Sequence, residues 1–193
     1  YQEIHENYFP DIEDAVLLFL NDYGTAYGIA DDKPVSLEAL EAMVTQEFGY
    51  ELDFETIGEF EDLSTFRSVF VPGKPPCLLI NGKLFPRQVK FLLARELGYK
   101  YLNLKERSQT STPDEVNSFQ QLLNDFRAAY FGGALLMPRK AILADLKAFF
   151  AMTTWETKPL DDMLNKYDVT PEMLFYRFSE LIPQHFNIQI HFL

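Results

Sequence analysis

The sequence predicts a helix-rich α+β domain with a small antiparallel or mixed sheet. Apolar residues recur at three- and four-residue spacing over most of the chain, while short β-branched or apolar runs gather between proline- and glycine-rich turns. A length of 193 residues with 47% apolar residues is enough for one full core. We expect one compact unit with three regions: an acidic helical region at 1–62, a core at 63–152, and a helical extension with a terminal strand at 153–193.

The acidic region is expected to hold two helices. Residues 11–23 place apolar side chains at helical spacing behind an acidic first turn. Ser36 is positioned to cap a second helix, which should stop at Gly49.

Three strands are expected next, at residues 50–57, 66–71 and 77–80. A proline- and glycine-rich turn follows the second run, and Asn81-Gly82 follows the third. We expect one edge of this sheet to be open near Leu78–Asn81, where an extended peptide can add as a further strand.

The rest of the chain is expected to be mainly helical. A helix that begins near Pro86 carries apolar side chains nearly all round, so it should be buried on most sides. A long helix is expected from Thr112, which is placed as its cap, to Pro138. Shorter helices should follow at 139–152, 160–167 and 171–181.

The net charge of −12 is unevenly distributed. Up to Asp62 there are 17 acidic residues and one basic residue, whereas the remainder has 12 acidic and 16 basic residues. This balance argues against a general nucleic-acid-binding surface, which needs basic side chains to neutralise phosphates. We expect the acidic segment to pack beside basic residues farther along the chain; the alternative is an acidic arm that binds a partner.

Cysteine content and the lack of long apolar runs indicate the cellular compartment. Cys77 is its one cysteine, so neither an intrachain disulfide nor a cysteine metal cluster is expected. No apolar run approaches the ~20 residues of a membrane span, and no signal peptide is recognisable. We therefore expect a cytoplasmic protein without membrane contact.

The most informative stretch is Phe91–Leu102, FLLARELGYKYL. A zinc-peptidase helix reads H-E-x-x-H, in which two histidines hold the metal and the glutamate is the general base. The same frame here reads Arg95, Glu96 and, four residues after the arginine, Tyr99. The glutamate is kept and both histidines are replaced.

This helix and a second segment, Asp125–Pro138 (DFRAAYFGGALLMP), resemble the ImmA/IrrE family of bacterial metallopeptidase-like domains. Family members show F-x-x-A-H-E-L-G-H, followed farther along by E-x-x-A-N-x-F-A-A-x-L-L-M-P. The resemblance covers roughly residues 63–182, including the strand at Leu78–Asn81 and a closing segment with Arg177. It implies a zincin-like fold.

The departures from the family pattern bear on activity. Arg95 and Tyr99 stand where the resemblance places the two zinc-binding histidines, and Asp125 stands where it places the third ligand. Arg127 also falls within the second motif. A guanidinium has no lone pair for a cation, and a tyrosine hydroxyl is a poor zinc ligand. We therefore expect no metal, no cofactor and no peptidase activity, since Glu96 would lack a metal-bound water to deprotonate.

Two uses of the altered site remain open. In the structural one, the charge of Arg95 takes the place of zinc and pairs with Glu96 and Asp125. In the ligand-binding one, Arg95, Tyr99 and Arg127 donate to the carboxylate or phosphate of a small metabolite.

The resemblance also implies a biological context. Members often follow an N-terminal helix-turn-helix domain of the Xre type, and a chain that begins at Tyr1 reads as part of a longer protein. The leading hypothesis is a non-catalytic sensor domain of a transcription regulator, which contacts DNA only through such a domain outside this chain. The alternatives are an active or residual metallopeptidase, a structural or homodimerisation module, and a peptide-binding module. DNA binding by residues 160–181 is disfavoured by their acidic side chains.

Overall fold

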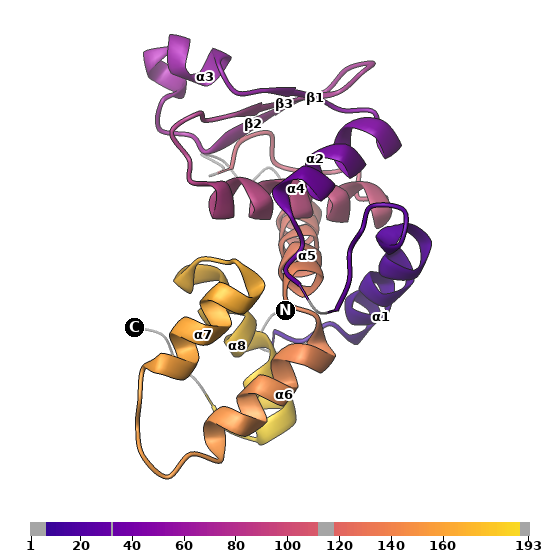
Figure 1. Ribbon diagram of the computed structural model, residues 1–193. Helices are drawn as coiled ribbons and strands as arrows, with labels where there is room; N and C mark the ends of the chain where they lie inside the picture. Colours follow the sequence, from indigo (N-terminus) through magenta and orange to yellow (C-terminus); the bar gives the residue numbers. More distant parts are fainter. Residues whose placement is uncertain (1–6, 32, 112–117, 190–193) are drawn as a thin grey trace. The chain divides into compact units, whose positions relative to one another are not determined.

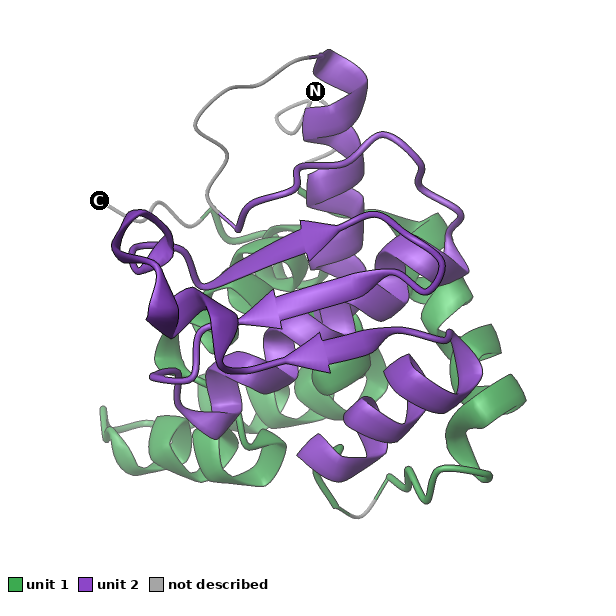
Figure 2. Ribbon diagram, turned by 90° about the horizontal axis from the view of Figure 1, so that it is seen from above, with its two compact units in different colours: residues 1–35, 133–193 green, residues 36–132 purple. Residues whose placement is uncertain are grey.

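The computed structural model describes residues 7–31, 33–111 and 118–189 (Figure 1). The chain divides into two compact units (Figure 2): unit 1 combines residues 1–35 with 133–193, and unit 2 spans 36–132. The boundaries expected at residues 62 and 152 describe a different division, which stays a prediction. The helix-rich α+β class with a small mixed sheet is confirmed.

Unit 2 carries the sheet and the helices that hold the two motifs. Its elements are, in order, α2 (Leu37–Ala42) with a π-type turn (Met43–Glu47), β1 (Glu51–Asp53), α3 (Thr56–Glu59), a 3-10 turn (Glu61–Leu63), β2 (Ser68–Val71), β3 (Cys77–Ile80), α4 (Pro86–Tyr101) and most of α5 (Phe119–Leu136). The predicted cap is confirmed, because the Ser36 hydroxyl accepts the Ala39 amide at 3.1 Å. Gly49 ends the helical stretch with a φ of +69°.

The sheet is mixed, with β3 in the middle. β1 runs parallel to β3, and β2 runs antiparallel to it. The open edge expected near Leu78–Asn81 is therefore wrong, since β3 is paired on both sides. β1 is shorter than predicted because the Asp53 carboxylate accepts the amides of Glu55 and Thr56, which turns the chain into α3.

A segment beyond α4 covers part of the outer edge of β2. Thr110 forms an isolated antiparallel bridge with Val69. The Phe70 amide donates to the Gln109 carbonyl at 2.6 Å, and the Ser111 amide donates to the Ser68 carbonyl at 3.0 Å. This part of the β2 edge is therefore occupied by the chain itself.

α4 and α5 cross in close backbone contact beneath the sheet (Figure 1). A Cβ atom added to Gly98 would lie 2.9 Å from the Ala128 carbonyl oxygen, and one added to Gly132 would lie 3.0 Å from the Arg95 backbone nitrogen. Only glycine permits this approach, which brings the ARELG motif against residues 128–132 of α5. The described part of α5 is capped by Ser118, whose hydroxyl accepts the Gln121 amide; the cap expected at Thr112 lies outside the described residues.

Unit 1 is helical. Its elements are α1 (Pro10–Phe19) with a π-type turn (Leu20–Gly24), the end of α5, α6 (Arg139–Phe150), α7 (Lys158–Tyr167) and α8 (Pro171–Phe186). The helices predicted at 11–23, 139–152, 160–167 and 171–181 are confirmed, although α8 runs farther. The predicted terminal strand is not formed at 187–189, and 190–193 lie outside the described residues.

The core of unit 1 contains a buried ionic cluster, here called the Arg177 cluster: Glu13, Met137, Arg177 and Glu180. The Arg177 guanidinium bonds Glu180 at 2.9 Å and Glu13 at 2.8 Å, and its Nε donates to the Met137 carbonyl at 3.2 Å. All three charged side chains are at most 5% exposed. Since Glu13 comes from the acidic N-terminal region, part of that region does pack against basic residues, as expected.

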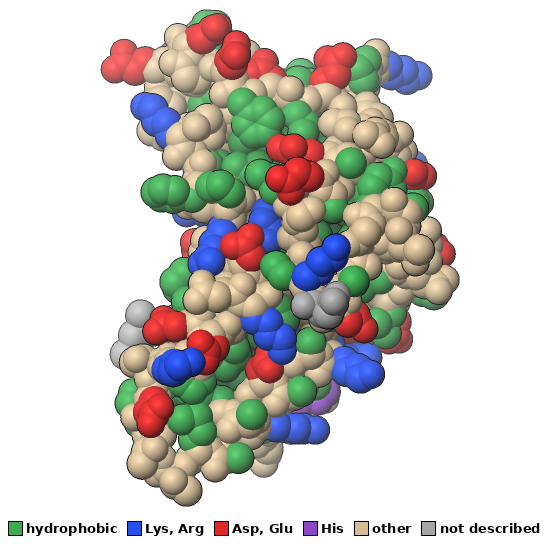
Figure 3. Space-filling view, viewed as in Figure 1, with side chains coloured by type: hydrophobic (Ala, Val, Ile, Leu, Met, Phe, Trp, Pro, Cys, Tyr) green, Lys and Arg blue, Asp and Glu red, His purple; other side chains and the backbone are tan. Residues whose placement is uncertain are grey.

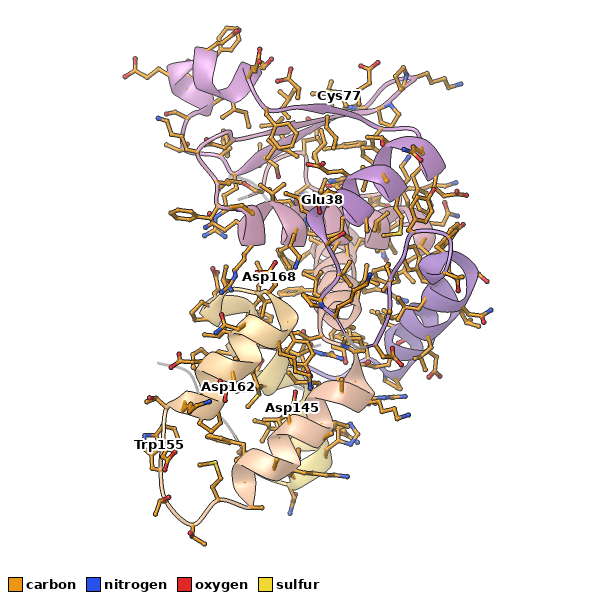
Figure 4. All side chains as sticks on the ribbon, viewed as in Figure 1. Glu38, Cys77, Asp145, Trp155, Asp162 and Asp168 are labelled. Carbon is orange, nitrogen blue, oxygen red and sulfur yellow. The ribbon has the colours of Figure 1, made fainter. Side chains whose placement is uncertain are left out.

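The surface of each unit is mixed in charge. In unit 1, Asp145 on α6 (labelled in Figure 4) accepts the Tyr167 hydroxyl at 2.6 Å and the Lys166 ammonium at 2.8 Å. The face shown in Figure 3 has acidic and basic side chains interspersed among apolar ones. None of the described helices combines the length and the apolarity that a membrane crossing requires.

Candidate functional site

Glu96, the glutamate of the motif, is buried in unit 2 and bound by an arginine. It is 1% exposed and lies on α4. Arg107 donates to both of its carboxylate oxygens, with Nη1–Oε2 and Nη2–Oε1 distances of 2.5 and 2.7 Å. The Tyr50 hydroxyl donates to Oε2 at 3.0 Å. Two parallel N–H···O bonds are the strongest form of this pairing.

Arg107 lies between two aromatic rings. Its Cζ atom is 3.8 Å from the ring centroid of Tyr99 and 3.9 Å from that of Phe70. Burial alone would lower the pKa of Arg107, but the hydrogen bonds and charge of Glu96 raise it above its usual value. The guanidinium is therefore protonated at any working pH. Tyr50, Phe70, Glu96, Tyr99 and Arg107 are called the Arg107 cluster below.

Asp125 forms a second, neighbouring network. Its carboxylate accepts the Tyr99 hydroxyl at 2.5 Å, the Ser108 amide at 3.0 Å and the Ser108 hydroxyl. Ser108 in turn accepts the Gln121 side chain at 2.8 Å. Both motif carboxylates are therefore fully engaged by the chain, and residues 107 and 108 supply most of the donors.

Both tyrosines of the site are held in their neutral form. Burial raises the pKa of Tyr99; the positive charge of Arg95 opposes this, and the hydrogen bond to Asp125 adds to it. Burial also raises the pKa of Tyr50, as does the adjacent charge of Glu96. A phenolate is the form that binds a metal, and this environment disfavours it.

The structure brings together three of the five residues predicted for the site. Glu96, Tyr99 and Asp125 lie in the connected networks described above. Arg95 is half-buried on α4 next to Glu96 in sequence, and adjacent positions on a helix do not face each other. The predicted pairing of Arg95 with Glu96 and Asp125 is wrong: Arg107 pairs with Glu96, and Tyr99 and Ser108 bind Asp125.

The two predicted arginines lie beside these networks. The Arg95 Nε atom is buried and makes no hydrogen bond to the residues that the structure describes, while its charge acts on Tyr99. Arg127 is half-buried on α5, two residues after Asp125, so the two side chains point to different sides of the helix. Their role as donors to a ligand stays a prediction.

The residues at the ligand positions do not fit a zinc ion. Arg95 offers no lone pair, and the Tyr99 hydroxyl is committed as a donor to Asp125. Both oxygens of Glu96 face the positive charge of Arg107, which repels a second cation from that carboxylate. Among the described residues, no three His, Cys, Asp or Glu side chains are grouped so that they could hold a metal.

Sequence reasoning missed Arg107 and the residues around it: Tyr50, Phe70, Arg107 and Ser108. Arg107 follows Glu96 by 11 residues, in an irregular segment with no hydrophobic period. The one usable signal was that a buried glutamate demands a cation. The sequence offered several candidates for it and no means of choosing among them.

Comparison with known proteins supports the fold and identifies the family. A solved structure of a Mycobacterium tuberculosis transcriptional regulator is similar with a TM-score of 0.62 and 19% identity, over 93% of this chain and 50% of that one. The chain thus spans about half the length of that protein. A search among curated proteins gives no match. The IrrE N-terminal-like domain family matches residues 52–179, which contain both motifs and every member of the Arg107 cluster except Tyr50, and the chain therefore belongs to this family.

Proposed function

We propose that this chain is a non-catalytic regulatory domain of a transcription regulator, built on a metallopeptidase-like fold that has lost its zinc ligands. The observation that carries the proposal is the bidentate bond of Arg107 to Glu96, at 2.5 and 2.7 Å. In a working zinc peptidase this glutamate must be free to take a proton from a metal-bound water. Here it is neutralised by an arginine that stays charged.

The regulatory part of the proposal is supported by the similar solved structure. That protein is a transcriptional regulator, and half of it lies outside the part that resembles this chain. An N-terminal helix-turn-helix domain outside this chain would then contact DNA, in keeping with the acidic balance of the present sequence. The domain would report on a metabolite or a polypeptide through this site.

Metal content and peptide cleavage test the non-catalytic part together. The chain is purified without chelator, its zinc is measured by elemental analysis, and cleavage of an unfolded protein substrate is followed with and without added zinc. We expect far less than one zinc per chain and no cleavage. One zinc per chain, lost in Glu96→Gln and Asp125→Asn, would overturn the proposal in favour of an active peptidase.

The regulatory part needs a ligand screen. Thermal-shift screening of acyl and phosphorylated metabolites against the wild-type chain tests whether Arg95, Tyr99 and Arg127 serve as donors. A metabolite that stabilises the wild type equally well in Arg95→Ala and Tyr99→Phe would exclude these residues from the ligand site.

A further inference from the structure

Four side chains of the Arg107 cluster form a receptor for a guanidinium, and the fifth is its occupant. The receptor, here called the guanidinium cage, consists of Tyr50, Phe70, Glu96 and Tyr99. The ring centroids of Phe70 and Tyr99 lie 3.9 and 3.8 Å from the Arg107 Cζ atom. The Glu96 carboxylate accepts hydrogen bonds from both terminal nitrogens of Arg107. A planar cation stacked between two rings and bound edge-on by a carboxylate matches the chemistry of a guanidinium and not of a compact ammonium.

The cage and its occupant come from different kinds of structure. Phe70 is on β2, Glu96 and Tyr99 are on α4, and Tyr50 directly precedes β1. Arg107 belongs to the irregular segment at 104–111. The cage therefore belongs to the sheet and α4 or lies next to them, whereas its occupant belongs to a separate segment.

Apart from Arg107, the segment at 104–111 is held by contacts outside the side chains of the cage. The Glu106 carbonyl accepts the Asn124 side chain at 2.8 Å, and Ser108 binds Asp125. The Gln109 and Ser111 backbones pair with the edge of β2. None of these bonds ends on a side chain of the cage, although the Leu104 amide donates to the Tyr99 carbonyl and Asp125 also accepts the Tyr99 hydroxyl.

We propose that the guanidinium cage is a recognition site for a monosubstituted guanidinium. Arg107 of the same chain occupies the site in this structure. When the 104–111 segment moves out, an arginine side chain of another polypeptide or a small alkylguanidinium occupies it instead. Exchange of occupant would release residues 107–111 from Glu96, Asp125 and β2 at once. This inference deepens the proposed function and rests on it for its meaning, because it names the ligand class of the same site.

Chemical rescue tests the cage. Arg107→Ala removes the atoms that ethylguanidinium supplies, so millimolar ethylguanidinium should restore most of the Tm lost by this variant, a rise of several degrees. Ethylammonium at equal ionic strength should restore little, because it lacks the planar fork. The matched control is Arg139→Ala, in which a partly exposed arginine bound to Tyr8 and Asp14 is removed from unit 1; its loss of Tm should not be rescued.

Further variants test whether the rescue depends on the Glu96 carboxylate and whether it depends on the choice of substitution at Arg107. Adding Glu96→Gln to Arg107→Ala should abolish the rescue. If Arg107→Ala does not fold, the same titration is made on Arg107→Met, which keeps an apolar stem between the rings. The cage would be refuted if ethylguanidinium and ethylammonium raised the Tm of Arg107→Ala equally, or if ethylguanidinium raised the Tm of Arg107→Ala and Arg139→Ala equally.

The wild-type chain tests exchange in trans. Hydrogen exchange at the Phe70 and Ser111 amides, whose hydrogen bonds join β2 and the segment, should accelerate with N-acetylarginine amide or with ethylguanidinium. A stronger effect of the arginine derivative points to a polypeptide, and an equal effect points to a small compound; unchanged exchange at saturation would refute the exchange. If the chain binds no zinc and ethylguanidinium does not restore the Tm of Arg107→Ala, the guanidinium cage is refuted and the proposed function stands. If the chain binds zinc and the Tm is not restored, both are refuted.

Discussion

The two units each bury an arginine, and the two arginines are held in different ways. In unit 1, Arg177 on α8 binds two carboxylates, from α1 and α8, and the carbonyl of Met137, which directly follows α5. In unit 2, Arg107 binds one carboxylate and two aromatic faces from an irregular segment. The Arg177 cluster joins helices that are distant in sequence, whereas the Arg107 cluster joins an irregular segment to the sheet and α4. We infer that the first is structural, and the exchange proposed above would allow the second to open.

Removing Arg177 should have the largest effect on stability. Arg177→Met leaves Glu13 and Glu180 buried together without a cation, and breaking a buried pair typically costs about 3–5 kcal/mol. The free energy of unfolding from urea titration at neutral pH measures it. A loss below about 1 kcal/mol, the range of exposed pairs, would show that the cluster is not structural.

Removing Arg107 should cost less, although it too leaves a buried carboxylate. In Arg107→Met we expect a loss of about 2 kcal/mol, because the 104–111 segment can shift and admit water to Glu96. The same urea titration provides the comparison. A loss as large as that of Arg177→Met would contradict the distinction between the two clusters.

The Arg177 cluster should also respond to pH. Burial raises the pKa of Glu180 to about 7, although the charge of Arg177 opposes the shift. Because this pKa lies above the unfolded value of 4.5, the stability that protonated Glu180 contributes is full below about pH 4.5 and is lost as the pH rises through about 7.

Glu180→Gln isolates this contribution. Between about pH 5 and pH 8, the free energy of unfolding of the wild type should fall relative to that of Glu180→Gln, by on the order of 1–3 kcal/mol. Urea titrations of both chains across this range provide the measurement. Parallel pH profiles would show that Glu180 does not titrate in this window.

The smallest effect is expected at an exposed ion pair in unit 1. Lys158 and Asp162 are paired at 2.7 Å on α7 but are 75% and 61% exposed. Lys158→Ala should leave the unfolding curve unchanged within error, since solvent screens such a pair. A clear loss would mean that burial is not what separates the two buried clusters from ordinary ion pairs.

The sequence predicted the helices and the burial of Glu96 because local periodicity carries that information. It also placed Tyr99 and Asp125 together through the two motifs. It did not predict that β1 pairs parallel with β3, since three residues are too few to show a period and the pairing is not local. Arg107 was missed for a related reason: the path of an irregular segment depends on tertiary contacts.

A double-mutant cycle of Glu96→Gln and Arg107→Met tests the central claim, that Arg107 binds the motif glutamate, which a zinc peptidase keeps free to act as a base. The free energies of unfolding of the wild type, both single variants and the double variant are measured by urea titration. We expect a coupling energy of at least about 1.5 kcal/mol, as found for close buried charge pairs. Additive effects, with a coupling below about 0.5 kcal/mol, would mean that the two side chains act independently and would contradict the account.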